Sequence, residues 1–155
     1  MPLQLIPAIH RATHRIGICL EAVDDLGVTQ AEAHILSHLV SHGDSTVGEL
    51  HRAFAHKRST LTSILDRLVA RELVTREVSP EDRRTFVVRL TNTGRKVATK
   101  VYGHLEALEV RALARVPKER LQELLTALAG VERVASECSR ERRQAPRRKR
   151  MTGRR

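Results

Sequence analysis

The sequence predicts a mainly α-helical fold that carries one small β-hairpin. Aromatic residues make up only 2% of the 155 residues, so the core must be built from Leu, Ile, Val and Ala, a composition that favours helices. Two runs rich in Val and Thr, Leu73 to Val78 and Thr85 to Leu90, instead have the composition of strands. A polar stretch of six residues joins them, which predicts a hairpin with a charged tip.

The amino-terminal part of the chain predicts two helices. Residues 3 to about 24 carry apolar side chains at helical spacing, including Cys19, and Gly27 ends this helix. Thr29 and Glu32 then form a capping-box pattern, so the next helix should begin there and run to about His42. The buried stripe of that helix is expected to hold Ile35, Leu36, Leu39 and Val40.

Two shorter helices are expected next, directly before the hairpin. Thr46 and Glu49 repeat the capping pattern and predict a helix that ends near Ala55. From Ser59 to Arg71 the apolar residues fall on one face of a second helix, which should be buried. They are Leu61, Ile64, Leu65, Leu68 and Val69. Two helices followed by a hairpin make a winged helix-turn-helix, with the second helix as the candidate recognition helix.

The opposite face of that second helix carries the candidate DNA-binding residues. Hydroxyl and guanidinium groups can meet base edges and phosphates, although hydroxyls near a helix start are also common as solvated groups. We expect major-groove contacts from Ser59, Thr62, Ser63 and Arg67, with Thr60 beside them. Backbone or minor-groove contacts are expected from Lys57 and Arg58 at the amino end of the helix.

The hairpin tip adds a second candidate contact. Asp82 is two residues from Arg84, and a charge-assisted bond between the two side chains would stiffen the tip. Arg83 would then point outward, to a phosphate or a narrow minor groove. The alternative for the tip alone is a solvated turn. The preceding helix favours the DNA-facing interpretation, with Arg83 and Arg84 as contacts and Asp82 as support.

These residues resemble a known family. Asp82, Arg83 and Arg84, then five residues, Leu90-Thr91 and, two residues later, Gly94 resemble the wing signature of the MarR family of bacterial transcriptional regulators. The resemblance covers roughly residues 5 to 138. Its upstream part lies in Val28-Thr29, Val47 to Leu50, Arg58 to Thr62 and Asp66 to Leu68.

Two residues depart from the family pattern. His51 stands where a small Ala usually lets the two helices of the turn motif pack closely, and Glu72 replaces the glycine that commonly ends the recognition helix. His51 could change the approach of the two helices or sense pH or a ligand. Neither residue removes the argument for the fold.

Two long helices are expected after the hairpin. One runs from Thr91 to about Arg115, and the other follows Pro117 and ends near Cys138. The first and last helices of the chain each have an apolar face that a small winged-helix core could not cover, so a second copy of the chain should cover it. The resemblance implies the same, because terminal helices interlock in MarR dimers.

The domain organisation follows from these elements. Residues 1–138 form one MarR-like domain, with a DNA-binding lobe at 28–94 and dimerisation helices at 3–26 and 92–138. Net charge is +10, but nine basic residues and one acidic residue lie from Ser139 onward, which leaves only +2 before it. We expect residues 139–155 to be a disordered basic tail that either drapes over DNA phosphates or only aids solubility.

The cysteines and histidines are candidate sensors. Cys19 is expected to be a buried apolar residue, and a redox switch through Cys19 or Cys138 is disfavoured. No zinc-finger or C-x-x-C spacing is present. His34, His38 and His42 lie four residues apart and should flank the apolar stripe on the surface, with metal binding as a weaker alternative.

The function expected from the sequence is transcriptional regulation, with repression as the commonest mode in the family. A homodimer would bind a pseudo-palindromic site on double-stranded DNA, and the resemblance implies release by a small ligand between the dimerisation helices and the winged helix. The alternative is sequence-independent DNA coating or scaffolding through the arginine-rich tail. We expect no enzyme activity, cofactor or membrane segment, and a cytoplasmic location.

Overall fold

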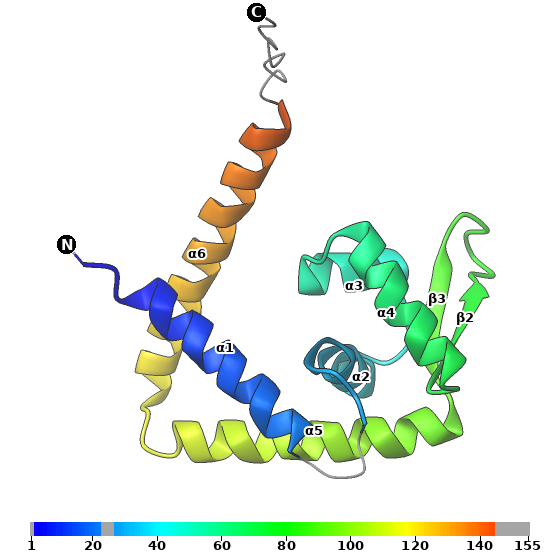
Figure 1. Ribbon diagram of the computed structural model, residues 1–155, viewed down its shortest axis with the longest axis horizontal. Coiled ribbons are helices and arrows are strands. Elements are labelled where there is room, and N and C mark those ends of the chain that lie inside the picture. The colour runs from blue at the N-terminus through cyan, green and yellow to red at the C-terminus, as the bar shows by residue number, and fades with distance from the viewer. Residues whose placement is uncertain (1, 23–26, 145–155) are drawn as a thin grey trace, which may run out of the picture. The chain divides into compact units, whose positions relative to one another are not determined.

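The computed structural model describes residues 2–22 and 27–144, in two compact units, Met1–Arg111 and Ala112–Arg155. The elements of the first unit are α1 (Leu5–Glu21), α2 (Gln30–His42), β1 (Ser45–Thr46), α3 (Val47–Phe54), α4 (Arg58–Ala70), β2 (Val74–Val78), β3 (Phe86–Leu90) and most of α5 (Asn92–Leu113) (Figure 1). The second unit contains α6 (Lys118–Gln144). The predicted mainly α fold with a hairpin wing is confirmed. No helix of the described chain is long and apolar enough to cross a membrane.

The core of the first unit lies between α2, α4 and the sheet. Helices α2 and α4 pack against each other, and α4 also packs against β2. The fully buried large side chains come from almost every element of this unit: Ile35, Leu36, Leu50, Leu61, Leu65, Leu68, Val74, Val88 and Val101. The predicted stripes of α2 and α4 are therefore largely correct. Val69 is the exception, since 40% of this residue is exposed beyond the edge of the buried face.

Three strands form the sheet, one more than the sequence predicted. Their order is β1-β3-β2 and both pairs are antiparallel, with Ser45 opposite Val88 and Val74 opposite Leu90. The extra strand, β1, has only two residues, too few for an alternating pattern, and Thr46 also caps α3. This strand ties the start of the helix-turn-helix to the wing.

Helix α1 docks on the start of α2. The Gln30 Nε2 group donates a hydrogen bond to the Thr13 carbonyl (2.9 Å), and Gly17 lies against the Gln30 side chain. Ile18 remains 51% exposed, and Cys19 is exposed rather than buried as predicted, because only Gly17 and Leu20 of this helix are buried. The helix ends at Glu21, before the predicted end, and residues 23–26 lie outside the described chain.

The junction between α4, the wing and α5 is the tightest part of the fold. The Thr91 hydroxyl donates to the Glu72 carbonyl (2.6 Å) and accepts from the Gly94 N–H (2.8 Å), which caps α5. Position 94 requires glycine because the Leu73 backbone passes close to it, and a Cβ there would overlap the Leu73 carbonyl. Glu72 adopts a positive φ of 55°, the conformation for which glycine is the usual residue at a helix end.

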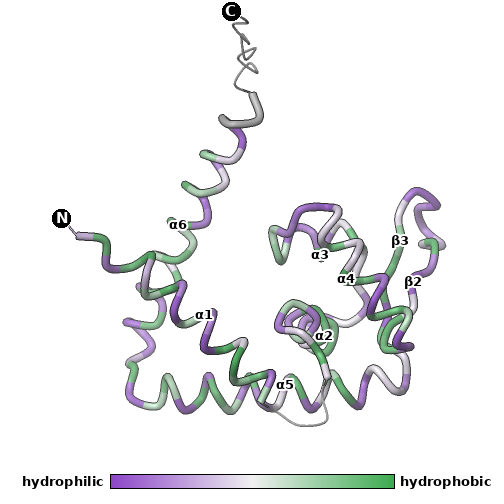
Figure 2. Tube along the Cα trace, in the orientation of Figure 1, coloured by the Kyte–Doolittle hydropathy of each residue, from purple (hydrophilic) through white to green (hydrophobic). Residues whose placement is uncertain are grey.

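Helix α6 in the second unit is longer than predicted. It continues to Gln144, so the predicted helix end near Cys138 is wrong. Residues 139–144 are good helix formers and the next proline is Pro146. Apolar and polar residues alternate along α6 (Figure 2), and Leu124, Leu125 and Val134 are 44–50% exposed. The remaining predicted tail, residues 145–155, lies outside the described chain.

Replacing Gly94 with Ala should destabilise the protein by about 3 kcal/mol or more, because the new methyl group must displace backbone. Gly103→Ala, also in α5, is the matched control. A Cβ at Gly103 meets nothing within 4 Å, so this change should stabilise the helix by about 0.5–1 kcal/mol. Chemical denaturation of both variants measures the difference, and equal midpoints would contradict this account of the junction.

Candidate nucleic-acid interface

The amino end of α4 is presented to solvent by the turn that precedes it. Thr46 and Glu49 form the predicted capping box on α3, with Thr46 N–H donating to Glu49 (2.7 Å). Ala55 then takes a left-handed conformation (φ 50°) and turns the chain into α4. Lys57 supplies no side-chain cap, so the first N–H groups of α4 are left for an external acceptor. Such free N–H groups and the helix dipole suit an anion.

The candidate residues on α4 lie on the solvent-facing side, as predicted from their spacing. All seven are exposed: Lys57, Arg58, Ser59, Thr60, Thr62, Ser63 and Arg67. The Ser63 hydroxyl donates to the Ser59 carbonyl one turn earlier (3.0 Å). Its oxygen lone pairs therefore remain available as acceptors.

A hollow of about 530 Å³ brings part of this face together with the wing. It lies between α3, α4 and the hairpin and unites Arg58 and Thr62 of α4 with Arg84 of the wing tip. Arg52 of α3 and Arg76 of β2 also line it, and neither was predicted from the sequence. Arg76 is a charged residue within the first predicted strand, and this was the signal that could have identified it. His51, one of the two departures from the family pattern, lines the same hollow.

The wing tip is held by Asp82, but through a different bond from the one predicted. The Asp82 carboxylate accepts from the Arg84 backbone N–H (3.0 Å) and from the Thr85 hydroxyl (2.9 Å), not from the Arg84 guanidinium. These two bonds hold the pKa of the Asp82 carboxyl below its ordinary value. Both arginine side chains at the tip, Arg83 and Arg84, are exposed. A backbone turn, rather than an ion pair, therefore orders the tip.

The wing is also tied to α4 through Arg76. Its guanidinium lies 4.6 Å from the centre of the Phe86 ring on β3 and 3.8 Å from the carboxylate of Asp66 on α4. The cation–π contact stabilises the hairpin face that lines the hollow. Arg76 therefore links β2 to β3 and to α4.

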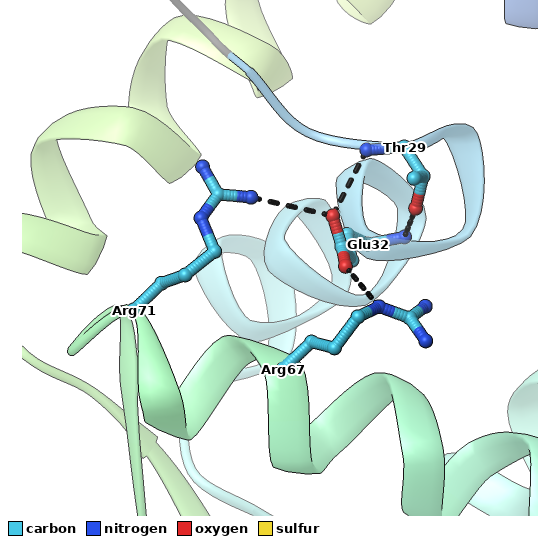
Figure 3. Close-up of polar contacts among 4 residues, drawn as sticks. All are labelled: Thr29, Glu32, Arg67 and Arg71. Atoms are coloured by element: carbon cyan, nitrogen blue, oxygen red, sulfur yellow. Dashed lines mark hydrogen bonds and ion pairs between the residues drawn. The ribbon is translucent and has the colours of Figure 1, made fainter.

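A buried carboxylate joins α4 to α2 (Figure 3). Glu32 is only 2% exposed and completes the predicted capping box with Thr29, whose N–H donates to it (2.9 Å). The Arg67 Nε donates to the same carboxylate at 2.9 Å, and an Arg71 terminal nitrogen approaches it at 3.4 Å. The side chain of Arg67 is still 52% exposed. Arg67 therefore has a structural partner that its predicted DNA role did not include.

The Glu32 carboxyl is ionised because its hydrogen-bond and charge partners together lower its pKa by more than burial raises it. Burial alone would raise the pKa of the carboxyl, but the hydrogen bond from the Thr29 backbone and the bond and charge of Arg67 together hold it below its ordinary value. The carboxylate thus stays ionised near neutral pH. Removing its arginine partners would therefore be destabilising, because it would leave a buried charge without compensation.

The histidines of α2 pack more closely than predicted. His38 stacks on His42 (4.2 Å between ring centres) and meets Phe54 of α3 edge-on (5.4 Å). His34 and His38 are partly buried and His42 is exposed; burial lowers the pKa of His34 and of His38. Among the described residues no three His, Cys, Asp or Glu side chains are grouped so that they could hold a metal ion.

A second hollow lies between α2 and α5. Its volume is about 300 Å³, and it is lined by Ser37, Tyr102, Leu105, Glu106, Glu109 and Val110. The Ser37 hydroxyl is buried and forms no hydrogen bond with another described residue. The resemblance implies a ligand between the dimerisation helices and the winged helix; α5 lies in the first of these parts and α2 in the second.

Comparison with known proteins agrees with this architecture. The model of the MarR family matches residues 26–85. The repressor MdtR of Bacillus subtilis is 30% identical over 102 residues, which cover 66% of each chain, just under two thirds of that relative. The uncharacterized HTH-type transcriptional regulator YfiV of the same organism is 30% identical over 118 residues, which cover 75% of this chain and 72% of YfiV.

A solved structure shows the same fold. The crystal structure of a MarR mutant from E. coli complexed with operator DNA is 25% identical, and the match covers 82% of this chain and 92% of that chain. The TM-score is 0.65. The helices, strands and wing described above therefore have a counterpart of known structure.

The Glu32 network predicts a pH dependence of stability. Because the pKa of Glu32 is lower in the folded state, its contribution is full above the unfolded value of about 4.3 and is lost as pH falls through the folded value. Glu32→Gln should cost about 2 kcal/mol at pH 7, and its difference from the wild type should shrink below about pH 4. Glu132→Gln, at an exposed position on α6, is the control. A pH-independent difference in denaturation midpoints would contradict the assignment.

The Asp82 bonds predict an effect confined to the wing tip. Asp82→Ala removes the acceptor of the Arg84 N–H, so hydrogen exchange at that amide should accelerate about five- to tenfold. Glu81→Ala, a change at the neighbouring exposed carboxylate, should leave the rate unchanged. Equal rates in both variants would show that Asp82 does not order the tip.

Proposed function

The chain belongs to the MarR family, and we propose that it is a sequence-specific DNA-binding transcriptional regulator that acts as a homodimer. The observation that carries the proposal is the hollow shared by α3, α4 and the wing. Four arginines, Arg52, Arg58, Arg76 and Arg84, line it together with Thr62. Guanidinium groups bind phosphates and guanine edges, while a hydroxyl can read several bases. The E. coli MarR mutant that shares this fold was solved with operator DNA.

Each candidate residue has a place in this proposal. The α4 hydroxyls of Ser59, Thr60, Thr62 and Ser63 face the major groove, with Arg67 further along the helix. Lys57 and Arg58 at the amino end contact phosphates together with the free N–H groups of α4. Arg83 and Arg84 reach the backbone or the minor groove from the wing tip that Asp82 orders. Phosphate contacts of this kind make binding depend steeply on salt.

The apolar faces that each unit leaves exposed support a homodimer. Ile6 and Ile18 of α1 are 50% and 51% exposed, and Leu125 and Val134 of α6 are 49% and 50% exposed. Patches of this kind are usually covered by a partner. A symmetric dimer presents two recognition helices, so the preferred site is an inverted repeat with half-site centres about 10 base pairs apart.

We propose repression as the mode of action and a small ligand as the signal. The relative MdtR is named a repressor. The hollow between α2 and α5 offers a ligand site next to the helix that holds Arg67 through Glu32. A ligand releases DNA only if it prefers one arrangement of the two lobes over the other. Such a regulator acts in the cytoplasm, where it meets DNA, without catalysis and without a cofactor.

Selection from random duplex DNA at roughly physiological salt tests the proposal. The full chain and a version that ends at Gln144, the last described residue of α6, should enrich the same inverted repeat. Failure of both versions to enrich any sequence, with binding by the full chain only, would overturn the proposal in favour of DNA coating by the tail.

The selected site then allows a test of the hollow. Arg84→Ala should weaken DNA binding about tenfold or more. It should also reduce the slope of log affinity against log salt concentration by the amount expected for about one phosphate contact. Arg95→Ala removes the same charge from the exposed start of α5, outside the hollow, and should have a much smaller effect. Equal losses in affinity, measured by titration at two salt concentrations, would mean that only net charge matters.

A further inference from the structure

Arg67 is bound at one edge and free at the other. Its Nε donates to Glu32, while its two terminal nitrogens point away from that carboxylate in Figure 3. Those nitrogens form no hydrogen bond with another described residue, and 52% of the side chain is exposed. A guanidinium held in this way presents a planar pair of donors in a fixed direction.

Arg67 also continues the polar stripe of the recognition helix. Ser59, Ser63 and Arg67 are spaced four residues apart, so they follow one another along the exposed face of α4. Arg67 therefore adds a guanidinium group to the row that the proposed function places toward DNA. A pair of parallel donors matches the O6 and N7 acceptors of guanine in the major groove.

We propose that Glu32 is a positioning residue for DNA recognition, which holds Arg67 in the orientation that contacts a guanine of the operator. This inference rests on the proposed function and assigns a specificity role to a residue that touches no DNA. Glu32 suits the task because it is itself immobilised: it is 2% exposed and is bonded to the Thr29 N–H that starts α2. An arginine without such a partner must lose more side-chain freedom to make the same contact.

Because Glu32 is negatively charged, its removal should affect the affinity for the selected site and the affinity for random DNA differently. Removing a negative charge next to two arginines raises the electrostatic attraction for any DNA. Releasing Arg67 from its orientation lowers the affinity for the one sequence that its contact reads. Specific and non-specific binding should therefore change in opposite directions, which loss of fold stability alone would not produce.

The experiment compares Glu32→Gln with the wild type on the selected site, on the same site with each guanine replaced in turn, and on random duplex. We expect affinity for the selected site to fall about tenfold, affinity for random duplex to stay equal or rise, and discrimination at one symmetric pair of guanines to disappear. Arg67→Lys should lose discrimination at the same guanines, and the double variant should be no worse than Arg67→Lys alone.

Thr29→Ala is the matched control, because it breaks the capping box while Arg67 keeps its carboxylate. It should reduce stability without changing base discrimination. Equal changes in specific and random binding for Glu32→Gln would overturn the positioning role, as would additive effects in the double variant. If Glu32→Gln does not fold, retained discrimination in Arg67→Lys overturns it instead. Absence of any preferred site for the wild-type chain would refute the proposed function itself, a result distinct from these.

Discussion

The buried carboxylate of Glu32 is the constraint on which the arrangement of the first unit depends. One side chain starts α2 through Thr29 and fixes α4 through Arg67 and Arg71, with Nε to oxygen and terminal nitrogen to oxygen distances of 2.9 and 3.4 Å. A carboxylate that is almost fully buried destabilises the fold if it has no partners. Separation of α2 from α4 would leave Glu32 without its arginine partners and is therefore unfavourable. The position of α4 therefore depends on α2.

The wing is held to the same frame by contacts of different kinds. Close approach of backbone at Gly94, the Thr91 hydroxyl between Glu72 and α5, and the short strand β1 fix the hairpin at its base. Asp82 orders the tip through a backbone N–H. Because these contacts are short and local, the exposed arginines can be displayed from a rigid surface, which lowers the entropy lost when a partner binds.

Sequence patterns predicted the elements well because helical spacing, capping boxes and the hairpin composition are local signals. They predicted Thr29–Glu32 as a cap, but the contact of Glu32 with Arg67 spans 35 positions and leaves no local pattern. The contacts of Arg76 with Phe86 and Asp66 also join separate elements, which explains why Arg76 was missed. Asp82 was paired with the wrong group of Arg84 because residue spacing does not show whether a carboxylate accepts from a backbone N–H or from a side chain. Cys19 was misplaced because an apolar stripe does not show which part of it a single chain buries.

Hydrogen exchange of the chain bound to its selected operator tests the central claim, that α4 and the wing tip together read DNA from one rigid frame. The first amides of α4, Arg58 to Thr60, and those of Arg83 and Arg84 should exchange more slowly on the operator than on random duplex. Slowing in neither segment, with protection elsewhere in the chain, would contradict this claim.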